Sequence, residues 1–266
     1  MAERSTVSGV NVIKEDRHFV TALARGLDLL ACFRSSDRML GNQELAERCK
    51  LPKSTVSRLT YTLTRLGYLH YDEAAAKYRL GTATLALGSA MLSRLDVRQL
   101  ARPTMQQMAD FSNAMVSLGM RDRLSMIYVE NCRSQAALTL SLDVGSRIPI
   151  ARTAMGRAYL AIASPAERND ILERVRELDE GAWPQIRDGV QRSLEEYQQF
   201  GCCTSLGDWQ SDVNAIAIGF RPADGSMPIS INCGGPAFTL SADFLLREMR
   251  PRLLDVVAQL RRSMDV

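Results

Sequence analysis

Residues 42–71, which read NQELAERCKLPKSTVSRLTYTLTRLGYLHY, constrain the fold of this chain more than any other segment. They hold two short helical patterns with a break at residues 50–52, and the second pattern ends at Gly67. Apolar residues recur at helical spacing in the second pattern and form one stripe: Val56, Leu59, Leu63 and Leu66. Hydroxyl, phenol and guanidinium groups lie on the opposite face: Ser54, Ser57, Arg58, Tyr61 and Arg65. An apolar back and a hydrogen-bonding front are typical of a helix that lies in the major groove of DNA.

The flanking segments complete a winged helix-turn-helix pattern over residues 18–81. Asn42 is expected to cap the first helix, and Pro52 suits the first turn of the second, where a backbone N–H has no helical partner in any case. Upstream, FVTALARGLDLLACF predicts a third helix with five core-facing residues: Val20, Leu23, Leu27, Leu30 and Ala31. Downstream, residues 69–71 and 77–80 flank a loose tip at 72–76 and predict a β-hairpin, the wing.

Two groups of residues are expected to contact DNA. The first lies on the two helices of the motif and can reach base edges and nearby phosphates: Gln43, Lys53, Ser54, Thr55, Ser57, Arg58 and Tyr61. The second lies on the wing and can reach the backbone or the minor groove: Lys77, Tyr78 and Arg79. Arg58 is the candidate for a bidentate contact to guanine. In an alternative interpretation of the wing, Tyr78 packs inward and the two charges are only solvated.

Charge is distributed unevenly along the 266 residues. Residues 1–81 hold 13 Lys and Arg against 9 Asp and Glu, a net charge of +4, whereas the rest of the chain has a net charge of −1. This asymmetry indicates that only the first part meets a polyanion. Because the excess is small, the prediction of DNA binding depends on the motif more than on charge.

Composition predicts an ordinary soluble protein with two domains. No apolar run has the length of a membrane span, and residues 1–17 are polar, which predicts a disordered arm without a secretion signal. The six cysteines include no CxxC pair, and a disulfide framework is not expected in a chain of this size without such a signal. We therefore expect a reducing, cytoplasmic location and no cofactor.

The chain after the wing is expected to form a linker helix and an α+β domain. Residues 82–96 are rich in Ala, Leu and Met with little charge, so this helix is expected to pack on a partner or, in the alternative, on its own chain. Helices are predicted over residues 97–113, 165–178, 185–200 and 242–264, and a short one at Gly156. Strands are predicted at 126–129, 138–142, 215–218 and 229–232, the last two joined by a turn at 223–225. Hairpin-linked strands between helices favour an antiparallel sheet over residues 97–266.

Across both domains the chain resembles the IclR family of bacterial transcription regulators. The matching segments are ALARGLDLL, ELAERCKLPKSTVSRLTYTLTRLGYL, YRLG, RIPIARTAMGRAYLA, DVNAIAI and INCGGPAFTLS. The resemblance implies a GAF-like C-terminal domain that binds a small effector. It also implies a homodimer or homotetramer that grips a palindromic operator.

The resemblance also implies where the effector binds. The family's pocket lies where three segments converge, and the matching positions here are Ile148, Thr153, Ala154, Met155, Gly156, Ser205, Asp212, Asn214, Ala215, Asn232, Cys233 and Gly234. A helix beginning at the TAMG loop offers unpaired N–H groups and its dipole, which favours the acidic group of a small organic acid. Alternatively, Thr153 only caps this helix and Gly156 only lets it pack. Several relatives carry Cys or Arg where Ala215 and Asn214 stand.

Two other functions are alternatives to a ligand-responsive regulator. The C-terminal part contains no histidine, since His18 and His70 are the only two, and no phosphate-binding glycine motif occurs, so hydrolytic, zinc and nucleotide chemistry are not expected. Thiol redox sensing or redox catalysis could use Cys202, Cys203 and Cys233. An architectural DNA-binding protein without any ligand would have a C-terminal domain without a cavity.

Overall fold

The computed structural model describes residues 18–34, 37–135, 142–222 and 227–264. The chain divides between Arg94 and Leu95 into two compact units. The boundary falls inside the segment 82–96 that is expected to form the linker. The expected arm at 1–17, the strand positions 138–141 and the turn at 223–225 lie outside the described residues.

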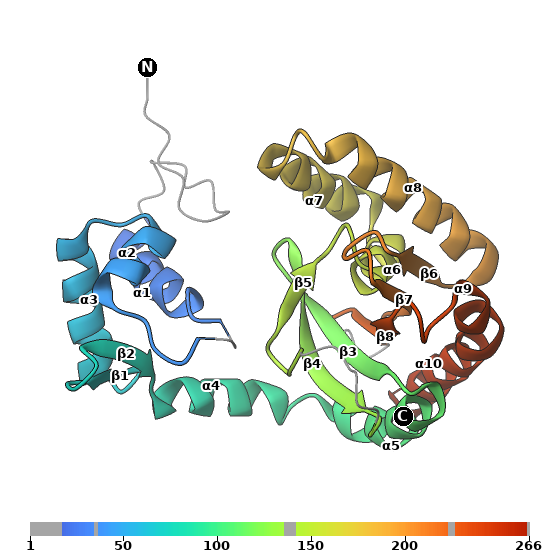
Figure 1. Ribbon diagram of the computed structural model, residues 1–266, viewed down its shortest axis with the longest axis horizontal. Coiled ribbons are helices and arrows are strands. Elements are labelled where there is room, and N and C mark those ends of the chain that lie inside the picture. The colour runs from blue at the N-terminus through green and yellow to red at the C-terminus, as the bar shows by residue number, and fades with distance from the viewer. Residues whose placement is uncertain (1–17, 35–36, 136–141, 223–226, 265–266) are drawn as a thin grey trace. The chain divides into compact units, whose positions relative to one another are not determined.

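The first unit holds helices and a two-stranded hairpin in the predicted order (Figure 1). Its elements are α1 (Thr21–Ala31), α2 (Asn42–Cys49), α3 (Lys53–Arg65), β1 (Leu69–Asp72), β2 (Lys77–Leu80) and α4 (Thr82–Leu92). Strands β1 and β2 pair antiparallel, from Leu69 opposite Leu80 to Asp72 opposite Lys77. The predicted winged helix-turn-helix is confirmed.

Asn42 joins α2 to α3 and does not cap α2. The N-cap of α2 is Gly41, whose N–H donates to the Glu44 carboxylate at 2.7 Å. The side-chain amide of Asn42 donates instead to Ser57 Oγ at 3.3 Å, and its oxygen accepts from the Thr60 hydroxyl at 3.4 Å. The expectation of a cap at Asn42 is wrong, because the residue stands one position inside the helix, where its side chain reaches the neighbouring helix.

Helix α1 packs with a different side from the one that its apolar spacing predicts. Gly26 and Leu29 are buried, whereas Val20, Leu23 and Leu27 are 61%, 61% and 58% exposed. A helix that is apolar on two sides does not reveal by periodicity alone which side faces the core. The prediction of the core-facing stripe is therefore wrong for these three residues, which form an exposed apolar surface, and for Ala31, which is also exposed. Leu30 does pack against the core of the first unit.

The second unit is built on a six-stranded antiparallel sheet with the strand order β5-β4-β3-β8-β7-β6. The strands are β3 (Met115–Asp122), β4 (Ser125–Arg133), β5 (Arg147–Pro149), β6 (Cys203–Leu206), β7 (Val213–Phe220) and β8 (Ile229–Pro236). The helices are α5 (Asp96–Ser112), α6 (Ala154–Ile162), α7 (Pro165–Leu178), α8 (Trp183–Phe200), α9 (Ala242–Phe244) and α10 (Arg250–Met264). A π-helical turn over Leu245–Met249 precedes Pro251. The predicted α+β fold is confirmed.

Helices cover both faces of this sheet (Figure 1). Helices α5 and α10 pack together on one side, and α6 packs on the other against β6, β7 and β8, with α8 in contact with α6. Successive strand residues point to opposite faces, so Ala215 and Ala217 of β7 face α6 whereas Asn214 and Ile216 face away from it. The face toward α6 therefore decides which strand residues can form a pocket.

Helix α4 has no buried residue. Its large apolar side chains Leu85, Leu87 and Met91 are all exposed. These side chains are therefore not buried by the rest of the first unit, to which α4 belongs. Neither α4 nor any other described helix has the length and apolarity required to cross a membrane.

Candidate functional site

Helix α3 presents the polar face that the sequence pattern predicts. Lys53, Ser54, Ser57, Arg58 and Tyr61 are exposed. Thr55 is half-buried, and the opposite side is anchored by Val56 and Thr60, which are both buried. The Arg58 guanidinium makes no hydrogen bond or ion pair with another described residue. Its five donors are therefore available to a partner outside the chain.

Gln43 connects the starts of the two motif helices. It is exposed on α2, and its amide nitrogen donates to Glu47 Oε1 at 3.1 Å. Its amide oxygen accepts from Lys53 Nζ at 3.4 Å. Gln43 and Lys53 thus lie side by side at the edge of the polar face of α3.

The wing residues divide into one that packs, one that is paired and one that is exposed. Tyr78 is half-buried, packs against the core of the first unit and lies with its ring centroid 4.8 Å from that of Tyr71. The alternative interpretation, in which Tyr78 packs inward, therefore describes its ring. Lys77 forms an ion pair with Glu44 at 3.1 Å, and Arg79 is exposed. Arg79 is the wing residue best placed to contact a polyanion.

A small pocket lies between the sheet and the start of α6. It is lined by Tyr128, Ile148, Thr153, Ala154, Met155, Ser205, Trp209, Val213, Ala215, Asn232 and Gly234. Its cavity volume is ≈ 20 Å³. This is enough for about one water molecule. None of the described lining residues carries a charge, so a ligand here would meet hydroxyl, amide and apolar groups only.

The first turn of α6 forms one end of the pocket. Thr153 is the N-cap, and its hydroxyl accepts from the Gly156 N–H at 3.2 Å, while the Arg157 N–H donates to the Thr153 carbonyl. The amides of Ala154 and Met155 are then the donors of this turn that the helix leaves unpaired. No acidic residue stands in the first turn, so the positive end of the helix dipole is not compensated there.

The structure brings eight of the twelve expected effector residues to the pocket: Ile148, Thr153, Ala154, Met155, Ser205, Ala215, Asn232 and Gly234. Asn214 and Cys233 do not line it, because side chains alternate along β7 and β8. Asn214 donates to the Leu240 carbonyl at 2.9 Å, and Cys233 contacts Ser112. Asp212 is exposed ahead of β7 and does not line the pocket either.

Gly156 serves the packing of α6 and does not line the pocket. A Cβ added to it would lie 2.0 Å from the carbonyl oxygen of Ile150. Its amide is already bound by Thr153. The placement of Gly156 in the pocket is therefore not what the structure shows, and the alternative, in which it lets the helix pack, describes the structure.

Three lining residues were not named from the sequence: Tyr128, Trp209 and Val213. Trp209 and Val213 lie in the region from Ser205 to Asn214, which the resemblance gives as one wall of the pocket, whereas Tyr128 lies outside it. Burial raises the pKa of Tyr128 above its ordinary value, and a side-chain hydrogen bond with Asn232 opposes this rise. The Oδ1 atom of Asn232 is buried and has no hydrogen-bond partner among the described residues. A buried acceptor without a partner requires an explanation, and a bound hydroxyl or protonated group would supply one.

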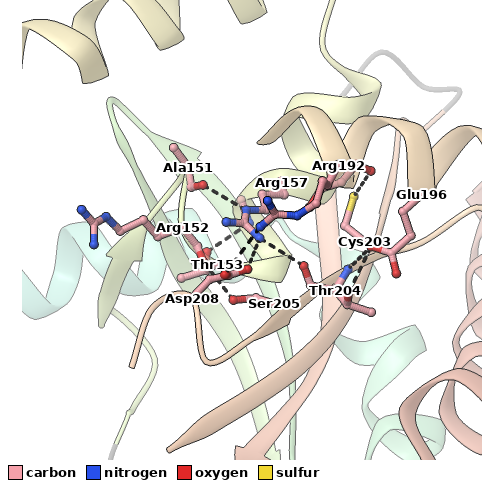
Figure 2. Close-up of polar contacts among 12 residues, drawn as sticks. Ala151, Arg152, Thr153, Arg157, Arg192, Glu196, Cys203, Thr204, Ser205 and Asp208 are labelled. Carbon is pink, nitrogen blue, oxygen red and sulfur yellow. Dashed lines mark hydrogen bonds and ion pairs between the residues drawn. The ribbon is translucent and has the colours of Figure 1, made fainter. Parts of the chain in front are cut away.

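The loop that carries Trp209 is held by a buried arginine (Figure 2). The guanidinium of Arg157, on α6, lies 2.5 Å from the Asp208 carboxylate and donates to the carbonyl oxygens of Ala151 at 3.0 Å and Thr204 at 3.4 Å. Helix α8 makes room for it, since a Cβ added at Gly189 would lie 2.4 Å from Arg157 Nη2. Arg157 therefore joins α6, β6 and the loop after β6 around the pocket.

Two family models match the chain and together cover most of it. The IclR helix-turn-helix domain matches residues 22–73, and the C-terminal domain of bacterial IclR transcriptional regulators matches residues 89–262. The chain belongs to the IclR family of transcriptional regulators. Its helix-turn-helix domain implies that it binds DNA.

Individual IclR-family proteins agree along nearly the whole length. The HTH-type transcriptional regulator TsaQ1/TsaQ2 of Comamonas testosteroni is 34% identical over 92% of this chain and 88% of its own. A crystal structure of an IclR-family regulator from Brucella abortus has a TM-score of 0.84 and 43% identity, with 95% of both chains covered. An IclR homologue from Microbacterium hydrocarbonoxydans, crystallised with 4-hydroxybenzoate, shares the fold at 19% identity, with a TM-score of 0.73 over 92% of this chain and 99% of that one.

The thiols of the IclR C-terminal domain do not form a reactive set. Cys202, Cys203 and Cys233 are all buried, and burial raises the pKa of each thiol, to about 12 for Cys202 and Cys233. Reactive thiols require a lowered pKa and access to solvent. Burial and the raised pKa values therefore argue against thiol redox chemistry at these three residues. No cluster of His, Cys, Asp and Glu suited to a metal ion occurs in the described residues.

Proposed function

We propose that this IclR-family regulator binds a two-fold symmetric operator through α3, and that a small organic acid in the pocket at the start of α6 changes its affinity for DNA. The observation that carries the second part is the first turn of α6. It offers two unpaired amides and an uncompensated dipole to a pocket with no charged lining residue. An anion is the ligand that such a helix end favours.

The polar face of α3 supports recognition of bases as well as phosphates. Arg58 and Tyr61 project from the exposed side of the helix, and the Ser57 hydroxyl lies beside Asn42. An arginine without a partner in its own chain matches the acceptor pair of guanine in the major groove. Lys53 stands at the helix start and can approach a phosphate.

Arg58→Ala is expected to weaken sequence discrimination by about 1–3 kcal/mol, because a bidentate base contact is lost. Lys53→Ala is the matched control and is expected to weaken binding to all duplexes alike. The salt dependence of its binding should also be shallower by about one in log–log slope. The DNA affinity of both variants is measured on a duplex that the wild-type protein selects from a random library. Full selectivity of the Arg58 variant would refute the assignment.

A dimer is proposed as the smallest active species. Two-fold operators require two reading heads, and exposed apolar side chains on α1 and α4 offer a surface to bury: Val20, Leu23, Leu27, Leu85, Leu87 and Met91. Light scattering should give at least twice the 29.5 kDa of one chain at micromolar concentration. A monomeric mass with intact operator binding would rule the dimer out.

The pocket must open to admit its ligand. Its present volume accepts little more than a water molecule, and Met155 lies across Gly119, where an added Cβ would be 2.1 Å from its sulfur. The side chains able to yield are Met155, which is flexible, and Trp209, which is half-buried on a loop. We propose that both move when the acid binds, with its carboxylate on the amides of Ala154 and Met155 and a polar group on Asn232.

Ala154→Pro is expected to lower the affinity for the acid by about tenfold or more, because one amide donor to a charged group is removed. Proline is accepted at the first helical position, and the extended backbone of Thr153 (ψ 149°) suits a following proline. Ala154→Val is the control, since it adds bulk at the same place and keeps the amide.

The probes for this test are 4-hydroxybenzoate, other small carboxylic acids and the matching amides. Each ligand is measured by the rise in melting temperature that binding to the folded state produces. A change in operator affinity in a gel-shift assay reports the switch. If the amides bind as tightly as the acids, or if both Ala154 variants respond alike, the carboxylate is not held by this helix end.

A further inference from the structure

The first unit contains two cysteines in direct contact. Cys32 is the C-cap of α1 and Cys49 is the last residue of α2, and their sulfur atoms are 2.8 Å apart. Both are half-buried, whereas Cys132, Cys202, Cys203 and Cys233 are buried. The two thiols are thus the ones in this chain that combine mutual contact with partial access to solvent.

Cationic groups surround this pair. Arg48 donates to the Cys32 carbonyl at 2.9 Å and is itself held by an ion pair with Asp37 at 2.5 Å. The hydrogen bond with Cys49 lowers the pKa of Cys32, and burial opposes this effect. The positive charges of Arg48 and Arg34 lower this pKa further, whereas the negative charge of Asp28 raises it. The pKa of Cys49 is raised by the same hydrogen bond. We take Cys32 as the attacking thiol of the pair, because Arg48 binds its backbone carbonyl and its pKa is the lowered one, and the thiolate is the reactive form.

We propose that Cys32 and Cys49 are an oxidisable thiol pair, a modification site that a hydroperoxide converts into an intramolecular disulfide between α1 and α2. The geometry permits it, because the sulfur atoms need to approach by less than about 1 Å to reach bonding distance. The product joins the ends of two helices within the DNA-binding unit, and three residues separate Cys49 from Lys53, where α3 begins.

The oxidation proceeds in two balanced steps. The Cys32 thiolate attacks the outer oxygen of the hydroperoxide, so an S–O bond forms, the O–O bond breaks and water or an alcohol leaves after proton uptake. The Cys49 sulfur then attacks the sulfenic sulfur, so the S–S bond forms, the S–O bond breaks and a second water leaves. Two thiols lose two electrons and two protons, and the hydroperoxide is reduced by two electrons.

The test uses the full chain treated with limiting hydrogen peroxide, followed by non-reducing peptide mapping. The expected product joins peptides 26–34 and 49–50, which trypsin releases around the two cysteines, with a mass loss of about 2 Da. Cys32→Ser should abolish this link, and Cys202→Ser, at a buried thiol outside the pair, should leave it intact. The pair is expected to react at least about tenfold faster than the buried thiols.

The other outcomes contradict the proposal. If both thiols remain free while a buried cysteine is oxidised, the pair is not the reactive site. If Cys32 and Cys49 form links only between two chains, the contact within the unit does not direct the chemistry. If the same disulfide-linked product forms equally in Cys32→Ser, the product does not contain Cys32 and its assignment to the Cys32–Cys49 pair is wrong.

Discussion

Gly156→Ala is expected to destabilise the C-terminal unit by about 3 kcal/mol or more, because the added methyl group overpacks against backbone that has no room to yield. The new Cβ would stand 2.0 Å from the carbonyl oxygen of Ile150 and 2.5 Å from its carbonyl carbon. In a helix with free space beside the glycine, the same change would add about 1 kcal/mol of stability through helix propensity. The sign of the change in stability therefore shows whether α6 packs closely against Ile150 at this position.

Tryptophan fluorescence is the measurement for this variant. The two tryptophans, Trp183 and Trp209, both lie in the C-terminal unit, so the signal reports the unfolding of that unit alone. A loss of 3 kcal/mol corresponds to a fall of roughly 10 °C in the melting temperature of a unit this size. Gly88→Ala in α4, where an added Cβ meets nothing within 4 Å, should leave this signal unchanged. An unchanged or higher midpoint for Gly156→Ala would contradict the close approach of α6 to Ile150.

Arg157→Met is expected to cost about 2–3 kcal/mol, because it leaves two carbonyl oxygens without their donor and Asp208 with the longer ion pair to Arg192 at 4.0 Å. This expected loss of stability is smaller than that for a fully buried ion pair, because the Asp208 side chain is 29% exposed and water can reach it. Methionine keeps the apolar stem in the space that Gly189 leaves, so the change tests the charge and its hydrogen bonds (Figure 2).

The same variant should also loosen the loop that carries Trp209. Acrylamide quenching of Trp209, measured in a Trp183→Phe background, is expected to increase when Arg157 is replaced. Arg187→Met is the control, because the ion pair of Arg187 with Asp188 is exposed and contributes about 1 kcal/mol at most. If both arginine variants unfold at the same midpoint, the network around Arg157 does not hold the loop.

The sequence predicts most of the helices because their end signals are local. Ser164 caps α7 through the Glu167 amide ahead of Pro165, and the α2–α3 pair follows from apolar spacing. Strand β3 was missed, because all but its last two residues are buried, so no alternation of polar and apolar residues marks it. The core-facing side of α1 was misjudged for a related reason, since both of its sides are apolar.

The pocket could be predicted by segment but not by side chain. Asn214 and Ala215 are neighbours in sequence, yet they point to opposite faces of β7, and only the strand register decides between them. Trp209 lies on a loop whose position depends on the contact between Arg157 and Asp208. These two residues are 51 positions apart in the sequence. The contact of Cys32 with Cys49 likewise depends on how α1 and α2 pack, which the sequence pattern does not reveal.

A pocket lined by uncharged residues has a consequence for what such a sensor measures. Its phenol, Tyr128, has a raised pKa, so nothing in the lining titrates near neutrality. Occupancy by a carboxylic acid then changes with pH only through the acid's own proton, which is lost well below neutrality for an ordinary carboxyl group. Near neutrality, occupancy of the pocket would then depend on the concentration of the acid and not on pH. A sensor that binds its acid through a histidine would respond to both.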